Sequence, residues 1–257
     1  MSDQASDKPS PVDQQIRRRT FISFAVFAGL NAAAFGAWKW LRHAPEEQAG
    51  ITAGAQKPLR QAFNQTEGAF RNLFSPHHLV RTYPKSAADK KVRTNGDIGL
   101  KSELDASWKL QVQCAASGPL SLTLDELKAL PKTELVFDFK CVEGWSQVQY
   151  WGGVRFLDVM DHYKLEPEKA MQYVGMETPD KDYYIGIDME SALHPQTLLA
   201  YEMNGQPLVS VHGAPLRLIV PVKYGIKNLK RIGSIFFSNQ RPRDYWAEQG
   251  YDYYSGL

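Results

Sequence analysis

An apolar segment near the N-terminus restricts the possible folds of this chain more than any other feature. Phe21–Leu41 reads FISFAVFAGLNAAAFGAWKWL, which is long enough to cross the roughly 30 Å hydrocarbon core of a bilayer as a helix. Trp38, Lys39 and Trp40 at its far end, followed by Arg42, are typical of side chains that anchor a helix at the membrane interface. We therefore expect residues 21–41 to form a transmembrane or signal helix.

Three consecutive arginines, Arg17 to Arg19, precede this segment. Their positive charge predicts that residues 1–20 stay in the cytoplasm and that the rest of the chain lies on the periplasmic side of the inner membrane. Arg18-Arg19-Thr20-Phe21-Ile22 resembles the twin-arginine export signal, whose machinery carries proteins that have already folded, usually around a cofactor. A plain membrane anchor is the alternative, and cleavage of the segment stays open.

The remainder divides into a linker, residues 42–90, and a folded domain, residues 91–257. The linker contains several prolines, and most of it shows no regular spacing of apolar residues. Within Lys57–Phe74, however, apolar residues recur at roughly helical spacing, which predicts a helix. In the domain, apolar and polar residues alternate over Trp108–Val112 and Glu134–Lys140, which predicts two half-buried strands. Further strands are expected within Pro215–Pro221 and Gly233–Phe237, and short helices over Asp125–Leu130, capped by Thr123, and Phe156–Tyr163. Short strands mixed with short helices, without a β-α-β rhythm, predict an α+β fold.

The composition excludes several classes of protein. Of the 257 residues, 43% are hydrophobic and 23% charged, which excludes an intrinsically disordered chain. A net charge of +2 argues against a nucleic-acid-binding protein. Two cysteines are too few for a disulfide-stapled scaffold or for a zinc site built from cysteines alone. The sequence has no C-x-x-C-H haem motif and none of the common hydrolase, zinc-protease or nucleotide-binding motifs.

The two cysteines lie in different surroundings. Cys141 follows a predicted strand and begins a glycine-containing turn, where a thiolate can project into a pocket as a metal ligand or a nucleophile. A buried structural thiol is the alternative for Cys141. Cys114 continues the preceding strand, and we expect it to pack in the core. A Cys114–Cys141 disulfide is a third possibility in an oxidising compartment.

A basic segment lies between Glu202 and Asp244. It contains seven basic residues and no acidic one, which predicts a local anion-binding surface, with a solvated basic face as the alternative. Glycines within the segment allow backbone N–H groups to approach a phosphate closely. The basic residues are Arg217, Lys223, Lys227, Lys230, Arg231, Arg241 and Arg243.

Three ordered motifs in the domain resemble those of the sulfite oxidase superfamily. Lys140-Cys141-Val142-Glu143-Gly144-Trp145-Ser146, followed by Trp151-Gly152-Gly153-Val154, resembles the molybdenum-ligand segment. His212-Gly213-Ala214-Pro215-Leu216-Arg217-Leu218-Ile219-Val220-Pro221 and Tyr224-Gly225-Ile226-Lys227-Asn228-Leu229-Lys230 resemble the second and third signatures. The likeness covers roughly residues 92–251 and is closest to the exported bacterial molybdopterin oxidoreductases, a branch that includes periplasmic methionine-sulfoxide reductases.

The resemblance implies a molybdopterin-binding fold of mixed β-sheets with short helices and a molybdenum-molybdopterin cofactor. Cys141 would supply the one protein thiolate to a metal whose other sulfur ligands come from the pterin. Arg217 and Lys230 would bind the pterin phosphate with the chain around them, and His212 would contact the pterin. Arg93-Thr94-Asn95-Gly96 resembles the Arg-Asn-His-Gly segment of sulfite oxidases, with the middle residues changed. The expected cofactor-binding residues are Thr94, Asn95, Thr178, His212, Arg217, Lys227, Asn228, Leu229 and Lys230.

The same likeness points to two possible substrates. Sulfite oxidases follow their cysteine with Ala-Gly-Asn-Arg, whereas Glu143 here places a carboxylate that would repel sulfite. Arg93 argues the other way, and both side chains are expected near the substrate. The resemblance favours reduction of a sulfoxide or similar oxide with electrons from a membrane cytochrome, and sulfite oxidation is the alternative. A non-catalytic tethered module with a Cys114–Cys141 disulfide is the second alternative.

Overall fold

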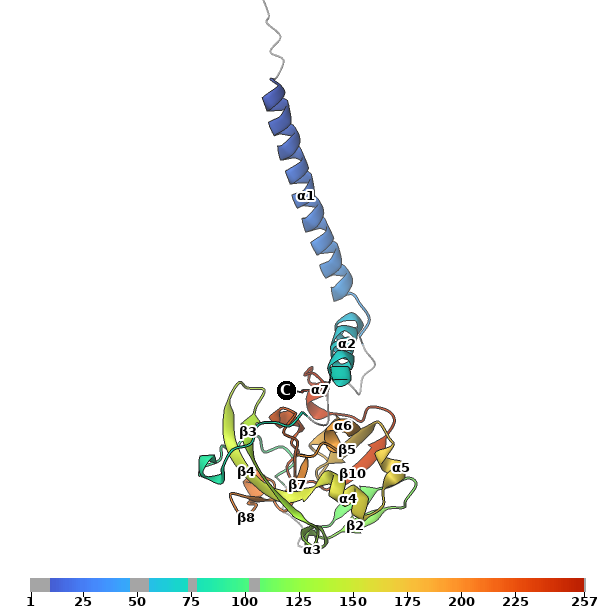
Figure 1. The fold of residues 1–257 in the computed structure, drawn as a ribbon. Coiled ribbons are helices and arrows are strands. Elements are labelled where there is room, and N and C mark those ends of the chain that lie inside the picture. The colour runs from blue at the N-terminus through green and yellow to red at the C-terminus, as the bar shows by residue number, and fades with distance from the viewer. Residues whose placement is uncertain (1–9, 47–55, 74–77, 102–106, 257) are drawn as a thin grey trace, which may run out of the picture.

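The computed structural model describes residues 10–46, 56–73, 78–101 and 107–256. Its first element is a long helix, α1, over Pro11–Arg42, which projects away from the rest of the chain (Figure 1). None of its residues is buried, and within the described ranges it is the one helix long and apolar enough to cross a membrane. The helix begins ahead of the expected segment because Ser10 caps it and the three arginines continue the helical turn.

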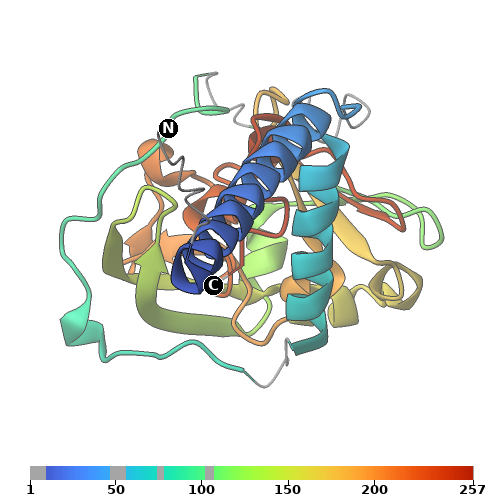
Figure 2. The ribbon, with the colours of Figure 1, turned by 90° about the horizontal axis from the view of Figure 1, so that it is seen from above.

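A second helix, α2, spans Lys57–Leu73 and confirms the helix predicted in the linker. Figure 1 shows α2 foreshortened below the end of α1, whereas Figure 2, the view from above, shows it along its length. The helix therefore runs across α1 rather than along it, and it separates α1 from the strands of the domain.

Two sheets form the domain. The first has the strand order β2-β1-β10-β5-β6, in which β1 and β10 are parallel and the other neighbours antiparallel. The second has the order β3-β4-β7-β8, with β9 also paired to β7, and is antiparallel throughout. The strands are β1 Leu110–Gln113, β2 Leu120–Leu122, β3 Lys132–Lys140, β4 Ser146–Arg155, β5 Tyr173–Glu177, β6 Tyr184–Asp188, β7 Leu198–Met203, β8 Gln206–Pro207, β9 Arg217–Ile219 and β10 Ser234–Ser238.

Short helices connect the strands, as an α+β fold requires. The first of them is capped by Thr123, whose hydroxyl accepts a hydrogen bond from the backbone of Glu126 while the Glu126 side chain bonds back, a capping box that confirms the predicted start. Every helix described in the domain has at most seven residues. They are α3 Leu124–Lys128, α4 Phe156–His162, α5 Glu166–Lys169, α6 Met189–Ala192 and α7 Tyr245–Glu248, with 3-10 turns η1 Lys85–Ala87, η2 Ser210–His212 and η3 Gly225–Lys227.

The second sheet is buried on both faces. Leu199 and Tyr201 of β7 belong to the main core, which both sheets share, whereas Leu198 and Ala200 belong to a smaller core on the opposite face. The expected apolar face of β3, represented by Phe137, packs in the smaller core. The strands of this sheet therefore pack against apolar side chains on both faces.

Candidate active site

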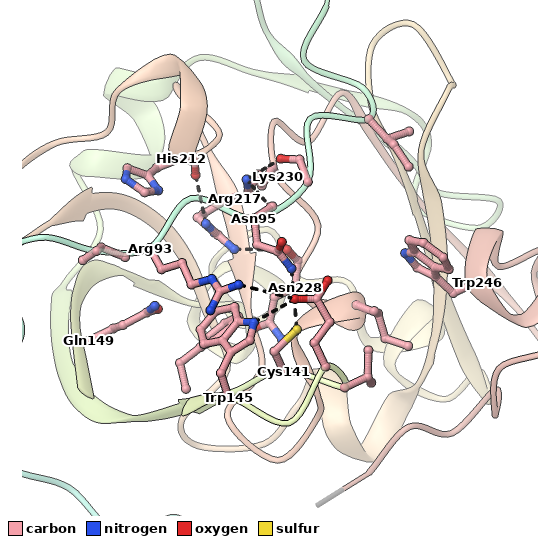
Figure 3. Close-up of a pocket in the computed structure, with 18 of the residues that line it drawn as sticks. Arg93, Asn95, Cys141, Trp145, Gln149, His212, Arg217, Asn228, Lys230 and Trp246 are labelled. Atoms are coloured by element: carbon pink, nitrogen blue, oxygen red, sulfur yellow. Dashed lines mark hydrogen bonds and ion pairs between the residues drawn. The ribbon is translucent and has the colours of Figure 1, made fainter. Parts of the chain in front are cut away.

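A pocket opens where the β3–β4 hairpin ends, and Figure 3 shows the side chains around it. The hairpin supplies one wall, and segments 92–98 and 212–230 supply two others. Trp246 of α7 and Tyr251 of the C-terminal tail complete it. The pocket thus brings together the cysteine motif and the basic segment, which lie far apart in the sequence.

Cys141 is the first residue of the five-residue loop that joins β3 to β4. Its backbone N–H donates to the carbonyl of Trp145 at 3.0 Å, and its carbonyl accepts from the N–H of Gly144 at 3.0 Å. Gly144 has a φ of 84°, a left-handed conformation that glycine adopts without steric cost. The Cys141 thiol is buried and accepts a hydrogen bond from Asn95 Nδ2 at 3.6 Å. A tight loop therefore holds one sulfur against the pocket.

The other cysteine has no part in the pocket. Cys114 packs in the main core, as expected from its place after β1. Burial, together with the charge of Glu168, raises the pKa of its thiol to about 11. Both cysteines are free thiols. The alternative of a Cys114–Cys141 disulfide is therefore wrong, because one sulfur lies in the core and the other at the pocket.

Three side chains form the outer wall beside Cys141. Trp145 Nε1 donates to Glu143 Oε2 at 3.0 Å, and the Arg93 guanidinium lies 4.8 Å from the centroid of the Trp145 ring. Arg93 and Glu143 approach to 3.9 Å, with side chains that are 55% and 52% exposed. An ion pair this exposed contributes little to stability. It does, however, leave the pocket mouth with no net charge from these two residues.

The inner wall carries a buried cation. The Arg217 guanidinium donates to the carbonyls of His212 and Asn228 at 3.0 and 3.2 Å and lies 4.6 Å from the centroid of the Trp151 ring. None of these partners carries a negative charge. Burial accordingly lowers the pKa of Arg217 to about 9. An anionic ligand at this place would supply the missing counter-charge.

Two further residues of the basic segment lie beside Arg217. Lys230 donates to the carbonyls of Asn95 and Gly96 at 2.7 and 2.8 Å, which ties segment 92–98 to the pocket. Burial and the nearby Arg217 charge lower the pKa of Lys230 to about 8. Burial and the Arg217 and Lys230 charges lower the pKa of His212 to about 4, so its ring is neutral at pH 7.

The structure brings most of the expected site residues together. Cys141, Glu143, Arg93, Asn95, His212, Arg217, Asn228 and Lys230 all line the pocket. Four others lie outside its lining. Thr94 is exposed, Leu229 is buried, and Thr178 bonds to Asp180 at 2.6 Å and to the backbone of Tyr183. Lys227 is buried in an ion pair with Asp244.

The basic segment is therefore not one anion-binding surface. Lys223 forms a buried pair with Asp188 at 2.8 Å, and Arg243 bonds Glu248 at 2.7 Å. Arg231 donates to Ser210 Oγ at 2.6 Å, and Arg241 donates to Asn64 Oδ1 at 3.0 Å. Arg217 and Lys230 are the two basic residues of the segment that line the pocket.

Gln149 of β4 and Tyr183 line the pocket and were not expected there from the sequence, whereas Trp151 belongs to the segment that resembles the molybdenum-ligand motif. Tyr183 donates to the carbonyl of Ile226 at 2.6 Å. The signal available in advance for Gln149 was its place two residues before Trp151, on the same side of the strand. Trp246 could not be found in this way, because only the folded chain brings α7 to the pocket.

Comparison with known proteins agrees with this geometry. Residues 97–246 match the family described as the oxidoreductase molybdopterin-binding domain. The chain belongs to this family. It is a molybdenum-dependent oxidoreductase of the sulfite oxidase superfamily, and the resemblance noted in the sequence is confirmed.

Bacterial relatives carry related names. A protein of Azospira oryzae, provisionally named a protein-methionine-sulfoxide reductase subunit, is 39% identical over 72% of this chain and 70% of its own length. Catalytic subunits named protein-methionine-sulfoxide reductase are 32% identical in Campylobacter jejuni, over 59% of this chain and 57% of theirs, and 36% in Xanthomonas campestris, over 55% and 48%. The chain spans about half the length of the latter two.

A solved structure shares the fold. The sulfane dehydrogenase SoxCD of Paracoccus pantotrophus superposes with a TM-score of 0.50 and 20% identity, over 65% of this chain and 47% of that one. At this identity the likeness shows the fold alone, and it confirms the predicted architecture of mixed sheets with short helices.

The pocket fits the molybdopterin cofactor that the family implies. Arg217 Nε, Gln149 Oε1 and Trp151 Nε1 are buried polar atoms without a hydrogen-bond partner among the described residues. Such atoms are costly unless a ligand bonds them, and they line the same pocket as the uncompensated Arg217 charge. Over the described ranges no three His, Cys, Asp or Glu side chains cluster as metal ligands. Cys141, which lines the same pocket, would supply a thiolate ligand to a metal that the pterin already chelates.

Proposed function

We propose that this protein reduces sulfoxides, with methionine sulfoxide as the substrate class, on the periplasmic side of the inner membrane. The observation that carries the proposal is one buried thiol, Cys141, at a pocket whose inner wall is cationic and whose mouth is neutralised by the Arg93–Glu143 pair. The names of the relatives support the same reaction. A neutral substrate suits such a mouth better than an anion.

Reduction of a sulfoxide takes up two electrons and two protons and yields a thioether and water. When bound, the cofactor supplies a metal that accepts the oxygen atom and passes the electron pair. Cys141 would hold that metal, and Arg217 and Lys230 would hold the anionic part of the cofactor. Val142 and Trp145 offer apolar and aromatic surface at the mouth, where a thioether group packs well.

The same proposal includes how the protein is exported and where its electrons come from. Arg17 to Arg19, in the first turns of α1, direct the folded, cofactor-loaded protein to the twin-arginine export machinery, and α1 then serves as its membrane anchor. The sequence has no haem-attachment motif. Electrons therefore come from a partner, and a membrane-bound cytochrome is the partner that an anchored enzyme can reach.

The test compares two reactions of the metallated protein. We expect a reduced viologen dye to be oxidised on addition of methionine sulfoxide, and we expect a slower reduction of ferricyanide with sulfite. Faster turnover of sulfite would overturn the assignment. The molybdenum content, measured on the same sample, shows whether an inactive preparation lacks its cofactor.

Sulfite oxidation is the second candidate, because Arg93 lines the mouth and can attract an anion. Glu143→Gln removes its counter-charge. A charge interaction of about 1 kcal/mol near the surface predicts a several-fold rise in kcat/KM for sulfite relative to methionine sulfoxide. Glu190→Gln, an exposed glutamate on α6, is the matched control and should leave the ratio unchanged.

A further inference from the structure

The helix α2 presents its apolar side to solvent and its polar side to the domain. Arg60 is 3% exposed, whereas Leu59 and Phe63 are 45% and 51% exposed. A surface helix of a soluble domain shows the opposite arrangement, with its apolar stripe against the core. The outward apolar face of α2 therefore needs a cover that the domain does not provide.

The inward face is fixed by polar contacts. Arg60 Nη1 donates to the carbonyl of Tyr251 at 3.4 Å, and Arg241 Nη1 donates to Asn64 Oδ1 at 3.0 Å. On the outward face, the Thr66 hydroxyl donates to the carbonyl of Ala62 at 3.0 Å, so it is bonded within the helix. The helix cannot turn its apolar face inward without breaking the contacts of Arg60 and Asn64.

The start of α2 is tied to the end of α1. Gln56 Nε2 donates to the carbonyl of Arg42 at 3.1 Å, and the N–H of Lys57 donates to the carbonyl of Pro45 at 2.9 Å. Trp38 and Trp40, in the last turns of α1, are exposed and of the type that lies at a membrane interface. Where α1 crosses a bilayer, the first turn of α2 is therefore close to the level of the lipid headgroups.

We propose that the outward face of α2 lies on the surface of the bilayer that α1 crosses. This rests on α1 being the membrane anchor of the proposed function. The orientation agrees, because α2 runs across α1 in Figures 1 and 2 and so along a membrane that α1 spans. Leu59 and Phe63 would enter the boundary between headgroups and acyl chains, as in other interfacial helices. Arg42 and Lys57 lie at the level of anionic headgroups. The face consists of Leu59, Ala62, Phe63, Thr66 and Ala69.

This contact would also fix the orientation of the active site relative to the membrane. Arg60 bonds the backbone of Tyr251, and Tyr251 lines the pocket. One helix thus links the bilayer surface to a wall of the site. The wall that Tyr251 and Trp246 form is then held near the membrane, on the side where a membrane-bound electron donor lies.

Two nitroxide labels on neighbouring residues of α2 test the proposal in the full, cofactor-loaded chain. Thr66→Cys places a label at the centre of the outward face, and Gln65→Cys places its control on the exposed polar side. The chain is reconstituted in vesicles of phosphatidylethanolamine and phosphatidylglycerol and recovered by flotation. Cys114 and Cys141 are buried, and labelling of the unsubstituted chain measures their background. Accessibility to oxygen and to a soluble nickel chelate is then compared.

We expect the oxygen-to-nickel accessibility ratio at Thr66→Cys to exceed that at Gln65→Cys several-fold in vesicles. Equal ratios in a chain that floats with the vesicles would overturn the α2 contact and leave the anchor intact. Shielding that develops only when a membrane protein partner is added would overturn it in favour of a protein interface. A chain that does not float would overturn both α1 as an anchor and the α2 contact, while sulfoxide reduction by that sample would still support the catalytic assignment.

Discussion

At the scale of single residues, the two cysteines differ in what surrounds the sulfur. Cys114 packs with the aliphatic side chains of the main core, where its raised pKa keeps the thiol protonated. Cys141 lies at the pocket with an amide N–H, from Asn95, directed at it. Of the two sulfurs, that of Cys141 belongs to a residue of the pocket lining and that of Cys114 does not.

Replacing each cysteine by serine separates their roles. Cys141→Ser should reduce molybdenum-dependent activity to the level of metal-free protein, and we expect the pterin to stay bound, because Arg217 and Lys230, the residues proposed to hold it, are unchanged. Cys114→Ser should lower the unfolding free energy and leave the molybdenum content per folded protein unchanged. Metal analysis, pterin fluorescence after extraction and urea titration measure the three quantities. Full activity in Cys141→Ser would show that another group holds the metal.

His212 makes the stability of the metal-free protein depend on pH. Its pKa of about 4 in the folded state lies below the ordinary value of 6.5, so the unfolded chain binds the proton more tightly. Stability is therefore lost as pH falls from 6.5 to 4, by at most about 3 kcal/mol from this residue. Urea titration should show a shallower loss over this window in His212→Asn. Identical slopes in the two proteins would place the titration elsewhere.

At the scale of elements, the β3–β4 loop should depend on a glycine. Gly144 has a φ of 84°, and a Cβ there would meet no atom within 4 Å, so alanine strains only the backbone. We expect Gly144→Ala to cost about 1 kcal/mol of unfolding free energy and to reduce molybdenum occupancy, because Cys141 shares the loop.

Gly118, with a φ of 81° and the same open surroundings, lies in the turn between β1 and β2 and provides the control. Gly118→Ala should cost a similar free energy, measured by urea titration, at unchanged occupancy. If the two variants lost molybdenum equally, the geometry of the Cys141 loop would not be the cause.

The sequence predicts those elements whose pattern is local. Apolar and polar residues alternate in β1 and in most of β3, and Thr123 caps α3 through a residue three positions along the chain, so these elements were visible in advance. The prediction that β3 is half-buried is wrong, because Val136 on its second face is buried as well. β7 was not, because Leu198–Met203 is buried on both faces and shows no alternation. Likewise the motif around Cys141 indicated the ligand, whereas α7 reaches the pocket only through tertiary packing.

At the scale of the whole molecule, the basic segment also joins separate parts of the fold. Lys227 was expected at the cofactor phosphate, but its ammonium pairs with Asp244 and donates to the carbonyl of Gly186 at 3.0 Å. Asp244 also caps α7 by accepting from the N–H of Ala247 at 3.0 Å. The pair thus joins η3, the first sheet and α7, and two of these parts contribute walls to the pocket.

A buried ion pair of this kind predicts a large loss of unfolding free energy when one partner is replaced. Asp244→Asn leaves the Lys227 ammonium without a counter-charge in a fully buried place, which should cost about 3–5 kcal/mol of unfolding free energy. Adding Lys227→Met removes that charge and should restore much of the loss, which urea titration of both variants measures. A cofactor role for Lys227 predicts a different pattern, since the double variant would then regain stability but bind no molybdopterin. We expect the double variant to regain both, because the pair joins the walls of the site, while Arg217 and Lys230 are the basic residues that line the pocket.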